Sequence, residues 1–302
     1  MILSRNEMQR NSFVKAFRRM QWDQFLPFVR GGVTHCLPLH GVTRRWQTYL
    51  SLPAVLHSYW ETYALDFPGH GASTTRLGRY LARDYVEPVI EFLESEIGRP
   101  VILYGHSLGA MVAASVAGRI PQLVSAVILE DPPFHTMGEK LQGNTHHGYF
   151  TSLREVVRYR SDLPLLVKQL SAIFVTEPAS GRRVPLGSVR DAASIRFTAS
   201  CLMTLDPAVL DPIVEGSWLD GYEVRNMLAA IKCPALLLQA DPQCGGMFTE
   251  EDGQLADELI SDGSRVRVLG CGHLIHWSQP AETARVITTF LASLTYKGST
   301  TC

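Results

Sequence analysis

The chain has 302 residues, of which 46% are hydrophobic and 19% are charged, and its formal net charge is −1. This apolar content can bury the core of one large α/β domain, or of a core domain with an insertion, which excludes a wholly disordered chain. The 28 Lys and Arg residues are balanced by 29 Asp and Glu residues. We therefore expect no nucleic-acid partner, because phosphate binding requires a concentrated basic face.

In chain order, a helical pattern over Gln9–Met20 and a strand pattern over Trp22–Arg30 come first. Beyond them, short apolar runs that suit buried strands alternate with longer amphipathic runs that suit helices. The predicted strands are Thr34–Leu39, Tyr59–Leu65, Val101–Tyr104, Ala126–Leu129, Ala235–Gln239 and Arg265–Leu269, and the predicted helices are Leu77–Ile97, Leu108–Arg119 and Ala281–Leu294. This order predicts an α/β fold with a mostly parallel central sheet flanked by helices.

The interval between the fourth and fifth of these strands is too long for a simple crossover. It begins at Pro132-Pro133, ends at Cys233-Pro234, and holds no comparable strand pattern. Its helical patterns cover Gly148–Arg160, Leu163–Val175, Val189–Met203 and Asp220–Ile231. We expect residues 1–131 and 232–302 to form the core, and residues 132–231 to form an inserted helical lid over the carboxyl edge of the sheet.

The strongest local motif is Gly105-His106-Ser107-Leu108-Gly109, with an apolar strand before it and a helix rich in small residues after it. A G-x-S-x-G sequence in this context predicts a sharp turn that exposes a nucleophilic serine, Ser107. An ordinary phosphate-binding turn is the alternative, but neither G-x-x-x-x-G-K-[ST] nor G-x-G-x-x-G is present at this turn. The same residues interrupt the most apolar stretch, 101–120, so we expect no membrane span.

A serine hydroxyl requires a base, and His273 follows the last predicted strand in Gly270-Cys-Gly-His273. His276 lies three residues further on and is the alternative, although we expect it to begin the next helix or to face the lid. His146 and His147 are adjacent, so their side chains diverge, and we expect them to be solvated lid residues rather than metal ligands.

The oxyanion of an acyl-transfer intermediate requires backbone N–H donors. Leu108, directly after the serine, supplies one, and the loop Leu39-His40-Gly41-Val42 supplies the other. We expect Val42 to be the second donor, with Gly41 as the alternative, and His40 to brace the loop.

Four segments, L-P-L-H-G-V, Y-A-L-D-F-P-G-H-G-A-S, V-I-L-Y-G-H-S-L-G-A and G-C-G-H-L-I-H-W-S-Q-P, resemble the α/β-hydrolase superfamily in that order. The resemblance covers about residues 33–131 and 232–294. It implies Ser107 as nucleophile and His273 as base, with Asp66, Gly69 and Gly71 as structural parts of a loop near the site. The family normally opens with a β-hairpin, for which Trp22–Arg30 supplies only one strand.

Two aspartates are candidates for the acid that orients the histidine. Most members of the family take it from the loop after the next-to-last strand, where Gln243 stands at the expected position and Asp241 lies two residues early. A minority take it from the strand before the lid, which matches Asp131, 24 residues after Ser107. We favour Asp131 over Asp241, and Glu130 is a distant third because it points to the opposite face of the strand. Without a catalytic role, Asp131 would brace its loop and Asp241 would form a turn at Pro242.

These residues predict a serine hydrolase that cleaves a carboxylic ester or lactone of a small to medium apolar molecule through an acyl-enzyme. Amide or carbon–carbon bond hydrolysis uses the same groups, and a non-catalytic binding protein or a cofactor-free lyase is the alternative on this fold. We expect Phe134, Trp218 and Trp277 to line the substrate pocket. The reaction requires no metal or organic cofactor, and we expect the partner to be a small-molecule substrate, with no membrane partner.

The six cysteines form no C-x-x-C pair and show no zinc-ligand spacing. The first seven residues lack the apolar stretch of a secretory signal. We therefore expect reduced thiols and a cytoplasmic location.

Overall fold

The computed structural model describes residues 18–20, 34–52, 60–74, 76–138, 141 and 145–294. These residues contain a seven-stranded sheet in the order β1-β3-β2-β4-β5-β8-β9. All neighbouring strands are parallel except β1, which is antiparallel to β3 at one edge. The strands are β1 (Arg18–Met20), β2 (Thr34–Leu39), β3 (Trp60–Ala64), β4 (Val101–His106), β5 (Val124–Glu130), β8 (Ala235–Ala240) and β9 (Gly263–Val268).

The predicted helix over Gln9–Met20 is wrong for residues 18–20, the part of it that the structure describes. Residues 18–20 form β1 and pair with Thr62, Tyr63 and Ala64 of β3. Backbone pairing with the free edge of β3 decides the conformation of this short segment, and a local residue pattern does not report such a partner. The predicted strand Trp22–Arg30 lies outside the described residues.

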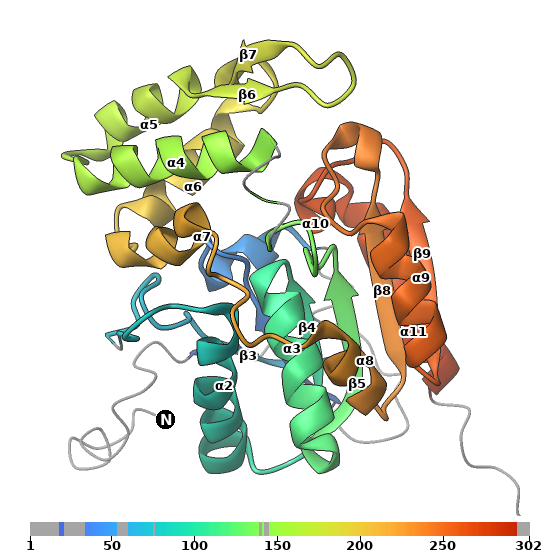
Figure 1. Cartoon of the computed structure of the whole chain (residues 1–302). Coiled ribbons are helices and arrows are strands. Elements are labelled where there is room, and N and C mark those ends of the chain that lie inside the picture. The colour runs from blue at the N-terminus through green and yellow to red at the C-terminus, as the bar shows by residue number, and fades with distance from the viewer. Residues whose placement is uncertain are drawn as a thin grey trace, which may run out of the picture.

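Helices cover both faces of the sheet (Figure 1). One face carries η2 (Ala82–Tyr85), α2 (Val86–Phe92), the π-helical turn η3 (Leu93–Ile97), α3 (Leu108–Arg119), α8 (Val224–Ala230) and α9 (Glu250–Leu259). The other face carries η1 (Trp46–Ser51), α10 (Ile275–Ser278) and α11 (Pro280–Leu294). The mostly parallel sheet with helices on both faces is confirmed, and the predicted helix Leu77–Ile97 begins only at Ala82.

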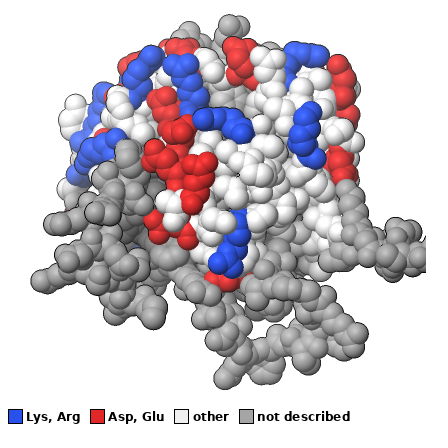
Figure 2. Space-filling model, turned by 90° about the horizontal axis from the view of Figure 1, so that it is seen from below, with Lys and Arg blue, Asp and Glu red and all other residues white. Residues whose placement is uncertain are grey.

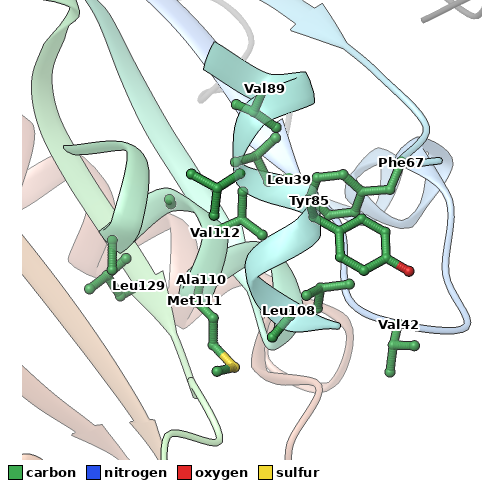
Figure 3. Close-up of a cluster of buried hydrophobic side chains, with 14 of the residues drawn as sticks. Leu39, Val42, Phe67, Tyr85, Val89, Leu108, Ala110, Met111, Val112 and Leu129 are labelled. Atoms are coloured by element: carbon green, nitrogen blue, oxygen red, sulfur yellow. The ribbon is translucent and has the colours of Figure 1, made fainter. Parts of the chain in front are cut away.

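The strands alternate their side chains between two apolar cores, as a sheet covered on both faces requires. Leu103 and Leu129 belong to the core under α3, and Tyr104 and Ile128 belong to the core under α11. Figure 3 shows part of the first core, with Leu39, Val42, Phe67, Tyr85, Val89, Leu108, Ala110, Met111, Val112 and Leu129 labelled. Every residue of α3 from Leu108 to Ala114 is buried, so this helix is held firmly behind the carboxyl end of β4.

The segment between β5 and β8 lies above the carboxyl ends of the strands (Figure 1). Its elements are α4 (Thr145–Arg158), α5 (Leu163–Ala172), β6 (Phe174–Thr176), β7 (Arg183–Pro185), η6 (Leu186–Ser188), α6 (Ala192–Leu202), η7 (Pro207–Leu210) and α7 (Asp211–Glu215). The chain then returns to the core through α8. The expectation that it holds no strand is wrong for β6 and β7, which form an antiparallel hairpin. The predicted helix Leu163–Val175 ends early because its last residues join this hairpin.

The charged residues on the face opposite this segment are mixed. Figure 2 shows Lys and Arg side chains interspersed with Asp and Glu side chains and with uncharged surface on that face. Among the described residues, no single helix is long and apolar enough to cross a membrane. α6 and Pro207–Glu215 pass the length and composition test only as a pair, and they are bent by 113°.

Candidate active site

Ser107 lies at the turn between β4 and α3, in a backbone conformation that side chains rarely adopt. Its φ is 55° and its ψ is −119°, and its N–H donates to the Glu130 carbonyl at 3.0 Å. The turn is possible only because glycine flanks it: a Cβ on Gly105 would lie 2.1 Å from the Gly109 carbonyl oxygen, and one on Gly109 would lie 1.8 Å from the Leu39 carbonyl oxygen. The strained serine at a crowded turn is typical of a functional position.

His273 and Asp131 come together from loops 142 residues apart in the sequence. His273 Nδ1 donates to Asp131 Oδ2 at 2.7 Å. Backbone N–H groups of Ala240 and Phe248 donate to Oδ1 at 3.0 and 3.2 Å, and Met247 N–H donates to Oδ2 at 2.8 Å. The buried carboxylate is therefore held in one orientation, with one of its lone pairs directed at the imidazole.

The other two acids considered from the sequence lie elsewhere. Asp241 accepts hydrogen bonds from the N–H groups of Gln243 and Gly270, at 2.9 and 3.1 Å, so it caps a turn between two loops. Glu130 points to the opposite face, where it pairs with the fully buried His276 at 2.8 Å. His276 thus lies in the next helix, α10, which is one of the two placements expected for it, and its side chain pairs with Glu130 in the core and does not face the lid.

His106, next to the nucleophile, contacts the loop that carries His273. Its Nε2–H donates to the His273 carbonyl oxygen at 2.8 Å, and the two rings lie 4.6 Å apart. Burial holds the pKa of His106 well below its ordinary value, although the charge of Glu130 opposes this. A neutral His106 therefore fixes the backbone of His273 in place.

Two backbone amides are candidates for the oxyanion hole, one at the start of α3 and one in the loop after β2. Leu108 N–H is the first of α3 and has no partner within the helix. In the described part of the chain, Val42 N–H has no backbone acceptor, and Val42 lines the same cavity as Ser107. His40 accepts from Phe67 N–H at 3.0 Å and donates to the Gly41 carbonyl, and burial lowers its pKa to about 4. A neutral His40 thus braces this loop.

Asp66 joins two loops near the site. Its carboxylate accepts from Trp46 N–H at 2.9 Å and from Ala72 N–H at 2.8 Å. Gly71 has a φ of 50°, and a Cβ there would lie 2.1 Å from Asp66 Oδ2. The Asp66–Gly71 segment is therefore a packed support of the site.

Ser107 and His273 both line a cavity of about 760 Å³ between the core and the inserted segment. Val42, Trp218 and Trp277 line it as well, whereas Gly41 and Leu108 are not among its lining residues. Gly41 lies against Ser107, because a Cβ on it would be 3.2 Å from the Cβ of the serine. Phe134, expected in the pocket, is instead fully buried in the core, where it packs edge-on against Phe248. It follows Pro132-Pro133 at the base of the insertion, so its direction is set by the core.

Three cavity residues were not identified from the sequence. Arg44 and Arg190 line the cavity, and so does His146, which had been expected to be solvated. Burial, together with the charge of His273, lowers the pKa of His146 to about 4. The position of Arg44, three residues after Gly41 in the motif loop, is the one signal that could have directed attention to it.

No group of three or more His, Cys, Asp or Glu side chains within the described ranges is arranged to hold a metal ion. His147, for example, donates from Nε2 to the Val214 carbonyl at 3.1 Å.

A family model described as "Alpha/beta hydrolase family" matches residues 34–286. The chain belongs to the alpha/beta hydrolase family. The matched range includes Ser107, Asp131 and His273, and it spans the inserted segment as well as the core.

Among curated relatives, a "Serine hydrolase-like protein" of Danio rerio is 26% identical over 86% of this chain and 83% of its own length. An "N-formylmaleamate deformylase" of Pseudomonas putida is 26% identical over 82% of this chain and 85% of its own. Among solved structures, the enol-lactonase from Burkholderia xenovorans superposes with a TM-score of 0.69 at 14% identity, covering 92% of this chain and 96% of that one. The family and the names of these relatives place this chain among hydrolases.

Proposed function

We propose that the chain is a serine hydrolase that cleaves a carboxylic ester or lactone of a small to medium molecule through an acyl-enzyme. The observation that supports this most is the hydrogen bond between His273 Nδ1 and the buried Asp131 carboxylate, in the wall of the cavity that Ser107 also lines. This is the arrangement by which an acid orients the base of a serine nucleophile.

In the proposed reaction, His273 Nε2 takes the proton of Ser107 as Oγ attacks the substrate carbonyl. The amides of Leu108 and Val42 hold the oxyanion of the tetrahedral intermediate, and the imidazolium returns the proton to the leaving group. Water, activated by the same imidazole, then attacks the acyl carbon and releases the acid. Asp131 stabilises the imidazolium and fixes the tautomer that carries hydrogen on Nδ1.

We propose that residues 132–231 act as a lid. The cavity is lined from this segment by Phe150, Leu186 and Trp218, and from the core by Ser107 and His273. A lid of this kind excludes water from the intermediate and selects the acyl group by shape.

A fluorophosphonate probe tests the nucleophile directly. We expect the wild type to be labelled and Ser107→Ala not to be, with hydrolysis of 4-nitrophenyl heptanoate reduced by several orders of magnitude in that variant. Ser188→Ala is the matched control, because Ser188 lines the same cavity from the inserted segment. Labelling of folded Ser107→Ala at the wild-type rate, or a folded wild type that is never labelled, would contradict the proposal.

Amide hydrolysis is the second candidate, since two relatives are named for acyl groups on nitrogen. These are the N-formylmaleamate deformylase and a "2-(acetamidomethylene)succinate hydrolase" of Mesorhizobium japonicum, which is 29% identical over 57% of this chain. The kcat/KM values for an anilide and a phenyl ester of the same acid separate the two. A higher value for the anilide would favour the amide reaction.

A further inference from the structure

The cavity contains a buried cation that has no counter-ion among the described residues. Arg44 is 4% exposed and lines the cavity together with Ser107. Its Nη1 has no hydrogen-bond partner, and no carboxylate of the described residues lies within ion-pair distance of its guanidinium. Burying an unpaired charge costs free energy. A buried guanidinium without a carboxylate partner therefore suggests that a bound molecule supplies the missing negative charge.

The guanidinium of Arg44 is held by aromatic faces and not by acids. Its Cζ lies 5.8 Å from the ring centre of Phe197 and 6.0 Å from that of Trp277, and these two rings stack 5.1 Å apart. Contacts with ring faces stabilise the cation and fix its plane, and Nη1 has no acceptor among the described residues.

The backbone also fixes the place of Arg44. Its N–H donates to the Gly41 carbonyl at 3.1 Å, which closes a turn in which Thr43 has a φ of 66°. A positive φ is unusual for a β-branched residue and indicates a strained turn. The same turn therefore presents Val42 N–H and the Arg44 side chain to one cavity.

A second cation, Arg190, lines the cavity from the inserted segment. Its Cζ lies 5.6 Å from the ring centre of Tyr149, and Nη1 donates to the Tyr149 hydroxyl at 3.5 Å. Burial and the charge of Arg190 lower the pKa of Arg44 to about 10, so Arg44 remains charged at neutral pH. Two cations that line one cavity repel each other, and each favours a bound anion beside it.

The acids that line the cavity have other partners. Asp191 accepts from Ser194 N–H at 2.8 Å as the cap of α6, and Glu177 lies in the β6–β7 hairpin with Arg182 at 3.6 Å and with Ser180. Neither is among the ion-pair partners of Arg44 or Arg190 in the described chain. The positive charge is therefore left for a bound molecule to neutralise.

We propose that the substrate is an anion: Arg44, assisted by Arg190, binds a carboxylate group of the molecule whose acyl carbon is attacked by Ser107. The inference rests on the proposed function and narrows its substrate class to an ester or lactone that carries a carboxylate, in place of the apolar molecule expected from the sequence. A guanidinium gives two parallel N–H donors that match a carboxylate, which fixes the orientation of the acyl chain as well as its charge.

The test compares two esters that differ in one terminal charge. They are the mono-4-nitrophenyl ester of adipic acid and 4-nitrophenyl heptanoate, and the measured quantity is the ratio of their kcat/KM values in wild type and in variants. We expect the wild type to favour the adipate ester, and Arg44→Met to lower the ratio by about 10- to 100-fold, as for the loss of a charge-assisted hydrogen bond. Arg190→Met should lower it less, and Arg44→Lys should restore part of it.

Arg225→Met is the matched control, because Arg225 lies on the surface with Glu258 and away from the cavity. The ratio for this variant should equal that of the wild type. A ratio unchanged by Arg44→Met and Arg190→Met would overturn the inference while leaving the serine hydrolase intact, since both esters would still be cleaved.

A binding experiment separates the two proposals when no ester is cleaved. Free adipate should raise the Tm of the wild type and of Ser107→Ala, because a ligand that binds only the folded state stabilises it. It should leave the Tm of Arg44→Met unchanged, and neutral 1,6-hexanediol should have no effect on any of them. Stabilisation without turnover would support the anion site and contradict the hydrolase, whereas a Tm of wild type unaffected by adipate would contradict the anion site. Should Arg44→Met fail to fold, the ester ratio and the adipate shift of Arg44→Lys and Arg190→Met decide the question.

Discussion

At the residue scale, Asp131 is the most constrained group in the site. Its carboxylate accepts three backbone N–H groups and His273 Nδ1–H, and its own φ is 45°. All four partners are donors, so an amide side chain at this position cannot satisfy them. Its NH₂ group would face an N–H donor whether it took the place of Oδ1 or of Oδ2.

We therefore expect Asp131→Asn to lower kcat by on the order of 10³–10⁴-fold, because the amide favours the wrong tautomer of His273. Asp241→Asn should retain most activity, since Asp241 accepts only from Gln243 and Gly270. The measurement is kcat for 4-nitrophenyl heptanoate, with the Tm of each variant recorded in parallel. Equal losses in both variants would remove Asp131 from the proposed triad.

The residues that sequence reasoning identified best are those that a short local motif defines. The G-x-S-x-G turn requires its glycines sterically, so Ser107 and Leu108 could be placed from the sequence. The choice between Asp131 and Asp241 depends on how two distant loops meet, and no local pattern reports this. Arg44 and His146 were missed for a related reason: their burial arises only when the inserted segment covers the sheet.

At the element scale, β5 ends by delivering consecutive carboxylates to opposite faces of the sheet. Asp131 faces His273 on one side, and Glu130 faces His276 on the other, with Tyr104 O–H as a further donor. His276 Nε2 in turn contacts Thr48 Oγ1 at 3.0 Å. The second carboxylate therefore holds α10, directly after His273, against the strand.

The buried Glu130–His276 pair predicts a loss of stability in acid. Burial by itself raises the pKa of Glu130, but the charge of His276 and the hydrogen bonds from His276 and Tyr104 outweigh it and bring that pKa to about 2. Because the folded-state pKa lies below the unfolded one, the stabilisation is present above about pH 4.5 and is lost as the pH falls from there toward 2.

Glu130→Gln should accordingly lower the free energy of unfolding by about 3–5 kcal/mol at pH 7, because the neutral amide leaves the buried His276 without the carboxylate charge that pairs with it. The difference from the wild type should shrink between pH 4.5 and 3. Urea denaturation at pH 7, 4.5 and 3 measures this, and Glu258→Gln, at an exposed ion pair, should change little at any pH. A difference between Glu130→Gln and wild type that is independent of pH would contradict the assigned charge of Glu130.

At the scale of the whole molecule, the parallel sheet was predictable because its central strands β4, β5 and β8 are almost wholly buried and read as apolar runs. β1 was not, because three residues at a sheet edge owe their conformation to β3. The inserted segment was predictable in length and helical content, but its β6–β7 hairpin is too short to produce a periodic pattern.

A group of polar contacts around Tyr80 helps to attach the inserted segment to the core. Tyr80 O–H, from a loop of the core, donates to Asp206 Oδ2 at 2.8 Å, and Asp206 N–H donates to the Gly69 carbonyl at 2.8 Å. Ala82 N–H donates to the Trp218 carbonyl at 3.0 Å. Asp206 also accepts from Ala208 N–H and from Arg76, so Tyr80 can be removed without leaving that carboxylate unpaired.

Tyr80→Phe should loosen the inserted segment selectively. The loss of a hydrogen bond to a partly exposed carboxylate costs about 1–2 kcal/mol, and we expect faster hydrogen exchange in α6, η7 and α7 with little change in β4 and β5. A looser segment leaves the cavity more open to water, so we expect kcat/KM to fall measurably even where the Tm of the variant is close to that of the wild type. Tyr159→Phe is the control, because Tyr159 lies in the same segment and is 76% exposed. Exchange that rises equally in the sheet and in the segment would show that the contact supports the whole fold and not the closure of the cavity.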